Sequence, residues 1–84
     1  MYKKLSIRAY RALKLAHLPM STASDMLAAG NAIMSKKVWS AGLISAVECY
    51  RLGGLGVYQI YNLIDGRLEL SHVKKLCVEI DKRK

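Results

Sequence analysis

Acidic residues are scarce in this chain, and none occurs in its first 24 positions. The 84 residues hold six Asp and Glu against fourteen Lys and Arg, which gives a net charge of +8. The excess gathers toward the two ends, whereas the middle is nearly balanced. Such a charge favours a polyanionic partner, such as DNA, an acidic protein, a nucleoprotein complex or an anionic membrane surface. The alternative is that the charge serves solubility alone.

Proline and cysteine are also rare, and their scarcity excludes several classes of protein. With one proline and six glycines the chain is neither collagen-like nor of low complexity, and its 52% apolar composition excludes a disordered tail. Cys49 and Cys77 belong to no CxxC motif and have no histidine pair nearby, so we expect no zinc site. Two buried, free thiols in a reducing cytoplasm are the expected state.

No uninterrupted apolar run is long enough to cross a membrane. The most apolar segment, residues 38–64, contains Glu48, Arg51 and three clustered glycines, whereas a membrane-spanning helix needs about 20 apolar residues. We therefore expect no integral membrane insertion and a cytoplasmic location. Residues 1–24 are basic and free of acids, so an organellar transit peptide stays open beside an ordinary core helix.

The sequence offers few groups for catalysis. His17 and His72 stand alone, and there is neither a paired-carboxylate motif nor a serine elbow. The glycines at 53–56 lack the strand that precedes a dinucleotide fingerprint. Val57 and Tyr58 follow them, where a Walker loop has its lysine and hydroxyl. The chain is therefore expected not to be an enzyme and to need no cofactor or metal.

Apolar side chains recur at intervals of three and four residues, which is the spacing of amphipathic helices. One stripe covers residues 2–17 and ends before the helix-breaking Pro19. The clearest stripe covers residues 39–50 and ends at Gly53 and Gly54, and two more cover 56–64 and 73–80. The members of these last three stripes are Trp39, Leu43, Ala46, Val47 and Tyr50; Val57, Ile60, Tyr61 and Ile64; and Val73, Leu76, Cys77 and Ile80. The sequence predicts an all-α single domain, residues 1–84, of about five short helices.

Polar residues and glycines mark where these helices begin and end. Thr22 and Asp25 have the spacing of a capping box, so a helix is expected to begin after Thr22. Gly30 either ends that helix or is a weak point inside a longer one. Ser35 and Ser71 are candidate N-caps for two later helices.

Residues 52–67, LGGLGVYQIYNLIDGR, have the spacing of a helix-turn-helix motif. With Gly54 at the turn, the apolar residues Leu55, Ile60 and Leu63 fall one, six and nine positions later, where such motifs place core residues. Glycine suits the turn because it adopts the left-handed backbone conformation that a side chain hinders. The alternative is a glycine hinge between two core helices whose polar residues face water.

On these residues, positions 46–70 resemble the Cro and C1 repressor family, whose members are helix-turn-helix proteins of phages. The string LGVYQ at residues 55–59 is similar to the turn of that family. The chain departs from the pattern at Tyr50, where the family has a small residue. Matching LGVYQ letter for letter moves the turn to Gly56 and places Asn62 at a core position, so the two alignments cannot both hold.

The resemblance implies a dimeric regulator of transcription that reads DNA with a helix near residues 56–65. It assigns base contacts to Tyr58, Gln59 and Asn62, since Gln and Asn can pair with adenine. It assigns phosphate contacts to Arg67, Lys74 and Lys75. An earlier stretch with similar spacing would place Lys36 and Lys37 on a reading helix, and Arg8 and Arg11 give the first helix a basic face.

A second class of function stays open beside DNA binding. A small basic helical protein can instead be a non-catalytic interaction module, an inhibitor or adaptor that binds an acidic protein or a nucleoprotein complex. Accessory proteins of phages and plasmids have this size and charge. Exposure of Tyr58, Gln59 and Asn62 beside lysines and arginines would favour the DNA reader, and burial of that segment would favour the interaction module.

Overall fold

Five helices form the part of the chain that the computed structural model describes, residues 5–36 and 40–83. They are α1 (Ile7–Leu15), α2 (Ala23–Met34), α3 (Ser40–Leu52), α4 (Val57–Leu63) and α5 (Leu70–Lys82). No strand occurs among these residues, so the predicted all-α fold is confirmed.

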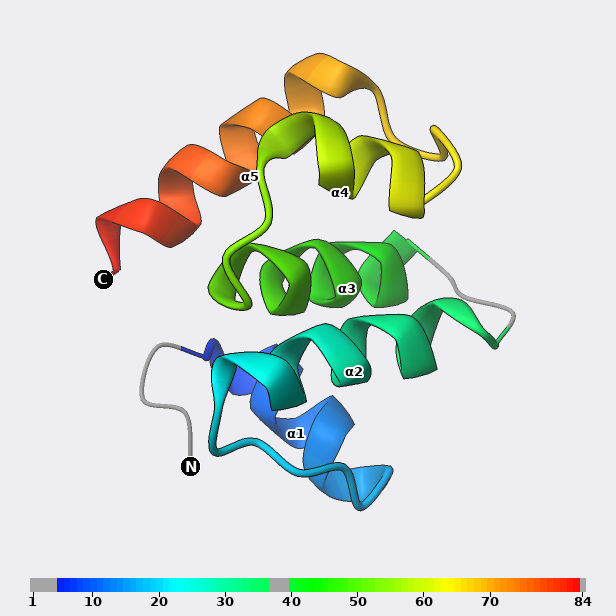
Figure 1. Cartoon of the computed structure of the whole chain (residues 1–84), viewed down its shortest axis with the longest axis vertical. Coiled ribbons are helices and arrows are strands. Elements are labelled where there is room, and N and C mark those ends of the chain that lie inside the picture. Colours follow the sequence, from blue (N-terminus) through cyan, green and yellow to red (C-terminus); the bar gives the residue numbers. More distant parts are fainter. Residues whose placement is uncertain (1–4, 37–39, 84) are drawn as a thin grey trace.

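The central helix is α3, which contacts each of the other four helices. Figure 1 shows α1 and α2 on one side of it and α4 and α5 on the other. The burial of its residues fits this central position. Every residue from Ser45 to Tyr50 is buried, whereas the other helices bury one face. A helix that is covered on all sides belongs at the centre of a bundle.

The core contains most of the residues that the helical stripes predict. The largest fully buried side chains are those of Leu13, Met26, Val47, Cys49, Tyr50, Ile60, Ile64, Val73 and Cys77. The stripe predicted for α1 consists of Leu5, Ala9, Ala12, Leu13 and Ala16; of these, Ala9 and Leu13 are buried, Leu5 is half-buried, and Ala12 and Ala16 are exposed. Trp39, the first residue of the predicted α3 stripe, lies outside the described residues.

Close packing of α2 on α3 depends on a glycine. The helix α2 continues through Gly30, so of the two alternatives the longer helix is correct. A Cβ atom at Gly30 would lie 2.6 Å from Cε1 of Tyr50, so only glycine leaves room for that ring. The Tyr50 hydroxyl then donates a hydrogen bond to Oδ1 of Asn31 at 2.8 Å. The predicted N-cap at Ser35 is wrong, because this residue lies at the C-terminal end of α2.

Two of the predicted helix starts have different outcomes. Thr22 and Asp25 form the predicted capping box, in which each side chain accepts a hydrogen bond from the backbone amide of the other, both at 3.0 Å. Hydrogen bonds from Ser21 also reach the Asp25 carboxylate and, with those from Thr22, lower its pKa. The predicted cap at Ser71 is wrong, because α5 begins at Leu70 with Glu69 as its N-cap.

Three helices end in the same hydrogen-bonded turn, the Schellman motif. At the end of α3 the amide of Leu55 donates to the carbonyl oxygen of Tyr50 at 3.1 Å, and Gly54 has a φ of 98°. The same bond pattern ends α1 and α4, where His17 and Asp65 take the left-handed position with φ of 57° and 56°. The backbone of these two residues is strained, because L side chains disfavour that conformation.

Candidate nucleic-acid interface

The connection between α3 and α4 consists of residues 53–56. Its left-handed residue is Gly54, as the first of the two helix-turn-helix alignments predicts. Gly56 has a φ of −78° and is the N-cap of α4, so the alignment that places the turn there is wrong. Asn62, which that alignment would bury, is exposed.

The inner face of α4 follows the apolar stripe rather than the helix-turn-helix spacing. Ile60 and Ile64 are fully buried, and Leu55 is half-buried. Leu63, which the helix-turn-helix spacing places in the core, is 43% exposed. The reason is that Ile64, one residue later, takes the inward position. The bulky Tyr50 is accommodated because its ring turns toward Gly30 of α2.

The outer side of α4 and the outer side of α5 form one surface. Tyr58 is 63% exposed, and Nζ of Lys74 lies 5.7 Å from the centroid of its ring. Asn62 is one helical turn beyond Tyr58 on the same side of α4 and is also exposed. We call this surface the α4–α5 face and define it by Tyr58, Asn62, Lys74, Lys75, Val78 and Lys82.

Lysines dominate the α5 half of this face. Lys75, Val78 and Lys82 follow one another at spacings of three and four along α5, and all are exposed. The nearby carboxylate of Asp81 is neutralised by Arg51 rather than by these lysines. It receives two hydrogen bonds from Arg51 of α3, at 3.0 and 2.7 Å. The hydrogen bonds that Arg51 donates to Asp81 also raise the pKa of the Arg51 guanidinium.

Gln59 has a structural task that the sequence reasoning missed. Its Oε1 accepts a hydrogen bond from the amide of Gly56 at 2.9 Å, which caps the start of α4. Paired recognition of adenine needs both the oxygen and the nitrogen of the side-chain amide. Because its amide oxygen is engaged by Gly56, we assign Gln59 a capping role rather than a base contact. The Gly56-x-x-Gln59 spacing, which is half of a capping box, was the available signal.

The remaining predicted nucleic-acid contacts, Arg67, Arg8 and Arg11, lie outside the residues that define the α4–α5 face. Arg67 is exposed in the connection between α4 and α5, two positions from Asp65 and from Glu69 in the sequence. Arg8 and Arg11 are on α1, across α3 from α4 (Figure 1).

The earlier candidate for a reading helix is wrong. The helix α2 runs on to Met34 without a turn, so no separate reading helix begins within residues 23–34. Lys36 follows the end of α2 and is exposed rather than lying on a second helix. Lys37 lies outside the described residues.

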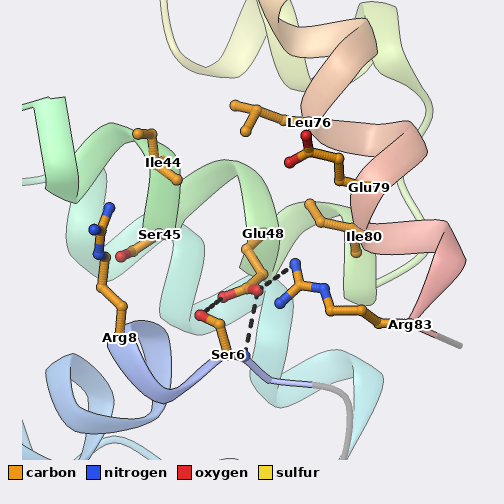
Figure 2. A pocket seen from close by; sticks show the side chains of 9 residues that line it. All are labelled: Ser6, Arg8, Ile44, Ser45, Glu48, Leu76, Glu79, Ile80 and Arg83. Atoms are coloured by element: carbon orange, nitrogen blue, oxygen red, sulfur yellow. Dashed lines mark hydrogen bonds and ion pairs between the residues drawn. The ribbon is translucent and has the colours of Figure 1, made fainter.

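A buried carboxylate joins α1, α3 and α5. The Glu48 side chain is 5% exposed; it accepts hydrogen bonds from the Ser6 hydroxyl at 2.7 Å and the Ser6 amide at 3.3 Å. Arg83 reaches it from the other side, at 2.7 Å (Figure 2). Because Ser6 is the N-cap of α1, this anion also lies at the positive end of the α1 dipole.

We call this arrangement of Ser6, Glu48 and Arg83 the clasp. It borders a cleft of about 360 Å³ whose rim includes Arg8 and Glu79 (Figure 2). Sequence reasoning missed the clasp. The only signal was one acid inside an otherwise apolar segment.

The thiols and histidines form no reactive site in the described part of the chain. Cys49 and Cys77 are buried thiols that form no disulfide, as predicted, and burial raises the pKa of the Cys49 thiol to about 12. Its thiolate is therefore negligible at neutral pH. His17 and His72 are exposed. Across residues 5–36 and 40–83, no three His, Cys, Asp or Glu side chains come together as metal ligands would.

Within the same ranges, no helix is both long enough and apolar enough to cross a membrane. Comparison of the chain with protein-family models, with curated proteins and with solved structures found no match. The resemblance of residues 46–70 to the Cro and C1 repressors therefore stays a prediction from the sequence.

Proposed function

We propose that this chain is a small, non-catalytic DNA-binding regulator that contacts duplex DNA through the α4–α5 face. The observation that carries the proposal is the position of Lys74, whose ammonium lies 5.7 Å from the ring centroid of the exposed Tyr58. This contact joins the polar side of α4 to the lysines of α5. Exposure beside lysines is the feature that favours a DNA reader over an interaction module.

The two halves of the face suit different parts of DNA. Lys74, Lys75 and Lys82 supply cations for phosphates, which position a protein on the duplex without reading its sequence. Asn62 can pair with adenine because its amide offers both a donor and an acceptor. Tyr58 adds an exposed ring that can pack on a base or on the methyl group of thymine. In this proposal α4 enters the major groove and α5 grips the backbone beside it.

A homodimer is part of the proposal, because readers of this type bind two half-sites with two copies. Sequences selected from a random duplex library are then expected to be palindromic, with half-sites about one helical turn apart. Selection of a single, non-palindromic site would indicate that the protein reads DNA as a monomer and would contradict the dimer.

The first test is binding to a random-sequence duplex at about 50 and about 200 mM salt, where phosphate contacts lose much of their strength. Wild type is compared with Lys74→Ala/Lys75→Ala and with Arg8→Ala/Arg11→Ala, a matched control that removes the same charge from α1. We expect the lysine variant to bind about tenfold more weakly at low salt and to lose about two units of salt slope. The arginine variant is expected to stay within about threefold of wild type, because its charges are across α3.

Absence of binding at the lower salt concentration would contradict the proposal. Equal losses in the two variants would show binding by net charge alone, without a specific face. In either case the second candidate, an interaction module, would become the leading one. The exposed side chains of Ile7 and Leu15 on α1 favour that candidate.

A further inference from the structure

The outer side of α1 combines exposed aliphatic side chains with cations. Ile7 is 72% exposed and Leu15 is 82% exposed, the highest values for large apolar side chains among the described residues. Arg8, Arg11 and Lys14 lie between and beside them, away from the buried Ala9 and Leu13. We call this surface the α1 face and define it by Ile7, Arg8, Arg11, Lys14 and Leu15.

Acids approach the α1 face at its Arg8 end, where Glu79 and the Arg83-paired Glu48 line the same cleft as Arg8. No Asp or Glu occurs in α1, and the only acid in the first 47 residues is Asp25. Asp25 is engaged at the start of α2 by Ser21 and Thr22. The Leu15 end of the face is hollowed, and the hollow is lined by Arg11, Lys14, Leu15 and His17. An apolar anchor with a carboxylate beside it would complement this hollow.

Three other occupants fit the α1 face less well. A phosphate backbone offers nothing to bury Ile7 and Leu15 against. A second copy of the chain would bring the same cations face to face, which is repulsive. An anionic bilayer would match the charge, but two aliphatic side chains on a nine-residue helix give little area for insertion.

We propose that the α1 face is a docking site for an acidic, amphipathic segment of a partner protein. Ile7 and Leu15 are eight residues apart, or about 12 Å along the helix axis. Two apolar side chains of the partner, seven or eight residues apart on a helix, would meet them. Carboxylates of the partner between those anchors would pair with Arg11 and Lys14. The proposal goes beyond DNA binding, because α1 and α4 lie on opposite sides of α3 (Figure 1).

The test uses a display library of helical peptides, selected against the full chain. We expect the selected peptides to be acidic and to carry two aliphatic residues seven or eight positions apart. They should bind Ile7→Ser/Leu15→Ser at least tenfold more weakly than wild type. A control variant, Val78→Ser on α5, should bind them like wild type. All three side chains are exposed, so the variants are expected to melt within a few degrees of wild type.

Two further arms separate the other occupants. Duplex DNA is expected to bind Ile7→Ser/Leu15→Ser and wild type with the same affinity. If neither protein binds DNA, the proposed DNA-binding function fails, and the peptide experiment still tests the docking site by itself. Vesicles containing phosphatidylserine are expected to bind weakly, with no dependence on Leu15. Leu15-dependent vesicle binding would assign the face to lipid and overturn the proposal. So would the absence of peptide enrichment, or peptides that bind the serine variant as well as wild type.

Discussion

Cations cover the outer side of α1 and the outer side of α5, but the side chains between the cations differ. Lys74 lies over the ring of Tyr58 on α4, one turn from Asn62, and the lysines of α5 flank one exposed aliphatic residue, Val78. Arg11 and Lys14 instead lie between two exposed aliphatic residues. Net charge alone predicts a polyanion for both faces. The groups that accompany the charge indicate which kind of polyanion each one fits: hydrogen-bonding groups for a nucleic acid, and apolar anchors for an acidic protein.

Charge reversal should give the largest difference in DNA affinity between variants of the α4–α5 face and variants of the α1 face. We expect Lys74→Glu/Lys75→Glu to weaken duplex binding by about 100-fold, because it removes two phosphate contacts and adds two repulsive charges. Arg8→Glu/Arg11→Glu makes the same change of net charge on α1 and should cost DNA affinity no more than about fivefold. Fluorescence anisotropy at low salt measures both. Equal losses would erase the distinction between the faces.

The clasp holds the two sides of the domain together, and breaking it should lower stability. Arg83→Met leaves the Glu48 carboxylate buried without its cation. Because the Arg83 side chain is itself 40% exposed, we expect a loss of about 2 kcal/mol rather than the larger cost of a fully buried pair. Arg8→Met, in the same cleft, should cost less than about 0.5 kcal/mol. Urea unfolding measures both, and a similar small loss in the two variants would contradict this role of the clasp.

Two neighbouring amides on α4 should behave differently. Asn62→Ala is expected to reduce the preference for a selected DNA sequence by about tenfold, since a paired amide contact discriminates by about 1–3 kcal/mol. Gln59→Ala should instead destabilise the fold by about 1 kcal/mol, through the lost cap on Gly56. Gln59→Glu keeps an acceptor for that amide and is the control for capping. Loss of sequence preference in Gln59→Ala, with stability unchanged, would reverse the two roles.

The strained turns at the ends of α1 and α4 allow a stability test on both sides of α3, because these two helices lie on opposite sides of it. His17→Gly and Asp65→Gly should each stabilise the protein by about 0.5 kcal/mol, because glycine relieves the left-handed strain but has more freedom when unfolded. Ala16→Gly, one residue earlier in the right-handed region, should destabilise instead. Thermal melts measure all three. A loss of stability in His17→Gly would show that the imidazole makes a contribution larger than the strain.

The smallest effect concerns Asp25, the one acid in the first 47 positions of the sequence. Hydrogen bonds from Ser21 and Thr22 lower its pKa below 3.8, so the ionised form is favoured in the folded state. Its stabilising contribution is therefore present above pH 3.8 and is lost as the pH falls through the lower, folded-state pKa. Melts of wild type and Asp25→Ala should differ at pH 6, and the difference should shrink as the pH falls below 3.8. A difference that does not depend on pH would remove ionisation from the explanation.

Local patterns in the sequence predicted the helices well. The periodicity of residues 56–64 identified Ile60 and Ile64 as core, and Thr22 with Asp25 marked the start of α2. These patterns work because their causes lie within one or two helical turns. Ser71 failed as a cap because the chain enters α5 one residue before it, and a hydroxyl alone does not fix the backbone.

Features that depend on residues distant in sequence were not predictable. Gly30 is tolerated inside α2 because Tyr50, 20 positions later, fills the space beside it. Glu48 is buried because Ser6 and Arg83 meet it from either side. At the candidate site, the sequence predicted Tyr58, Asn62, Lys74 and Lys75, and the structure exposes all four on α4 and α5. It could not show that Arg8 and Arg11 belong to another surface, because that depends on the position of α3.

The clasp has a consequence for how the ends of this domain open. Ser6 lies 42 positions before Glu48 and Arg83 lies 35 positions after it, yet all three meet at one carboxylate. In most small domains the first and last turns fray independently, with opening free energies close to zero. Here, release of either end leaves a buried charge less well compensated, so it weakens the hold on the other end. Amide protons in the first turn of α1 and the last turn of α5 should therefore exchange with solvent as one unit.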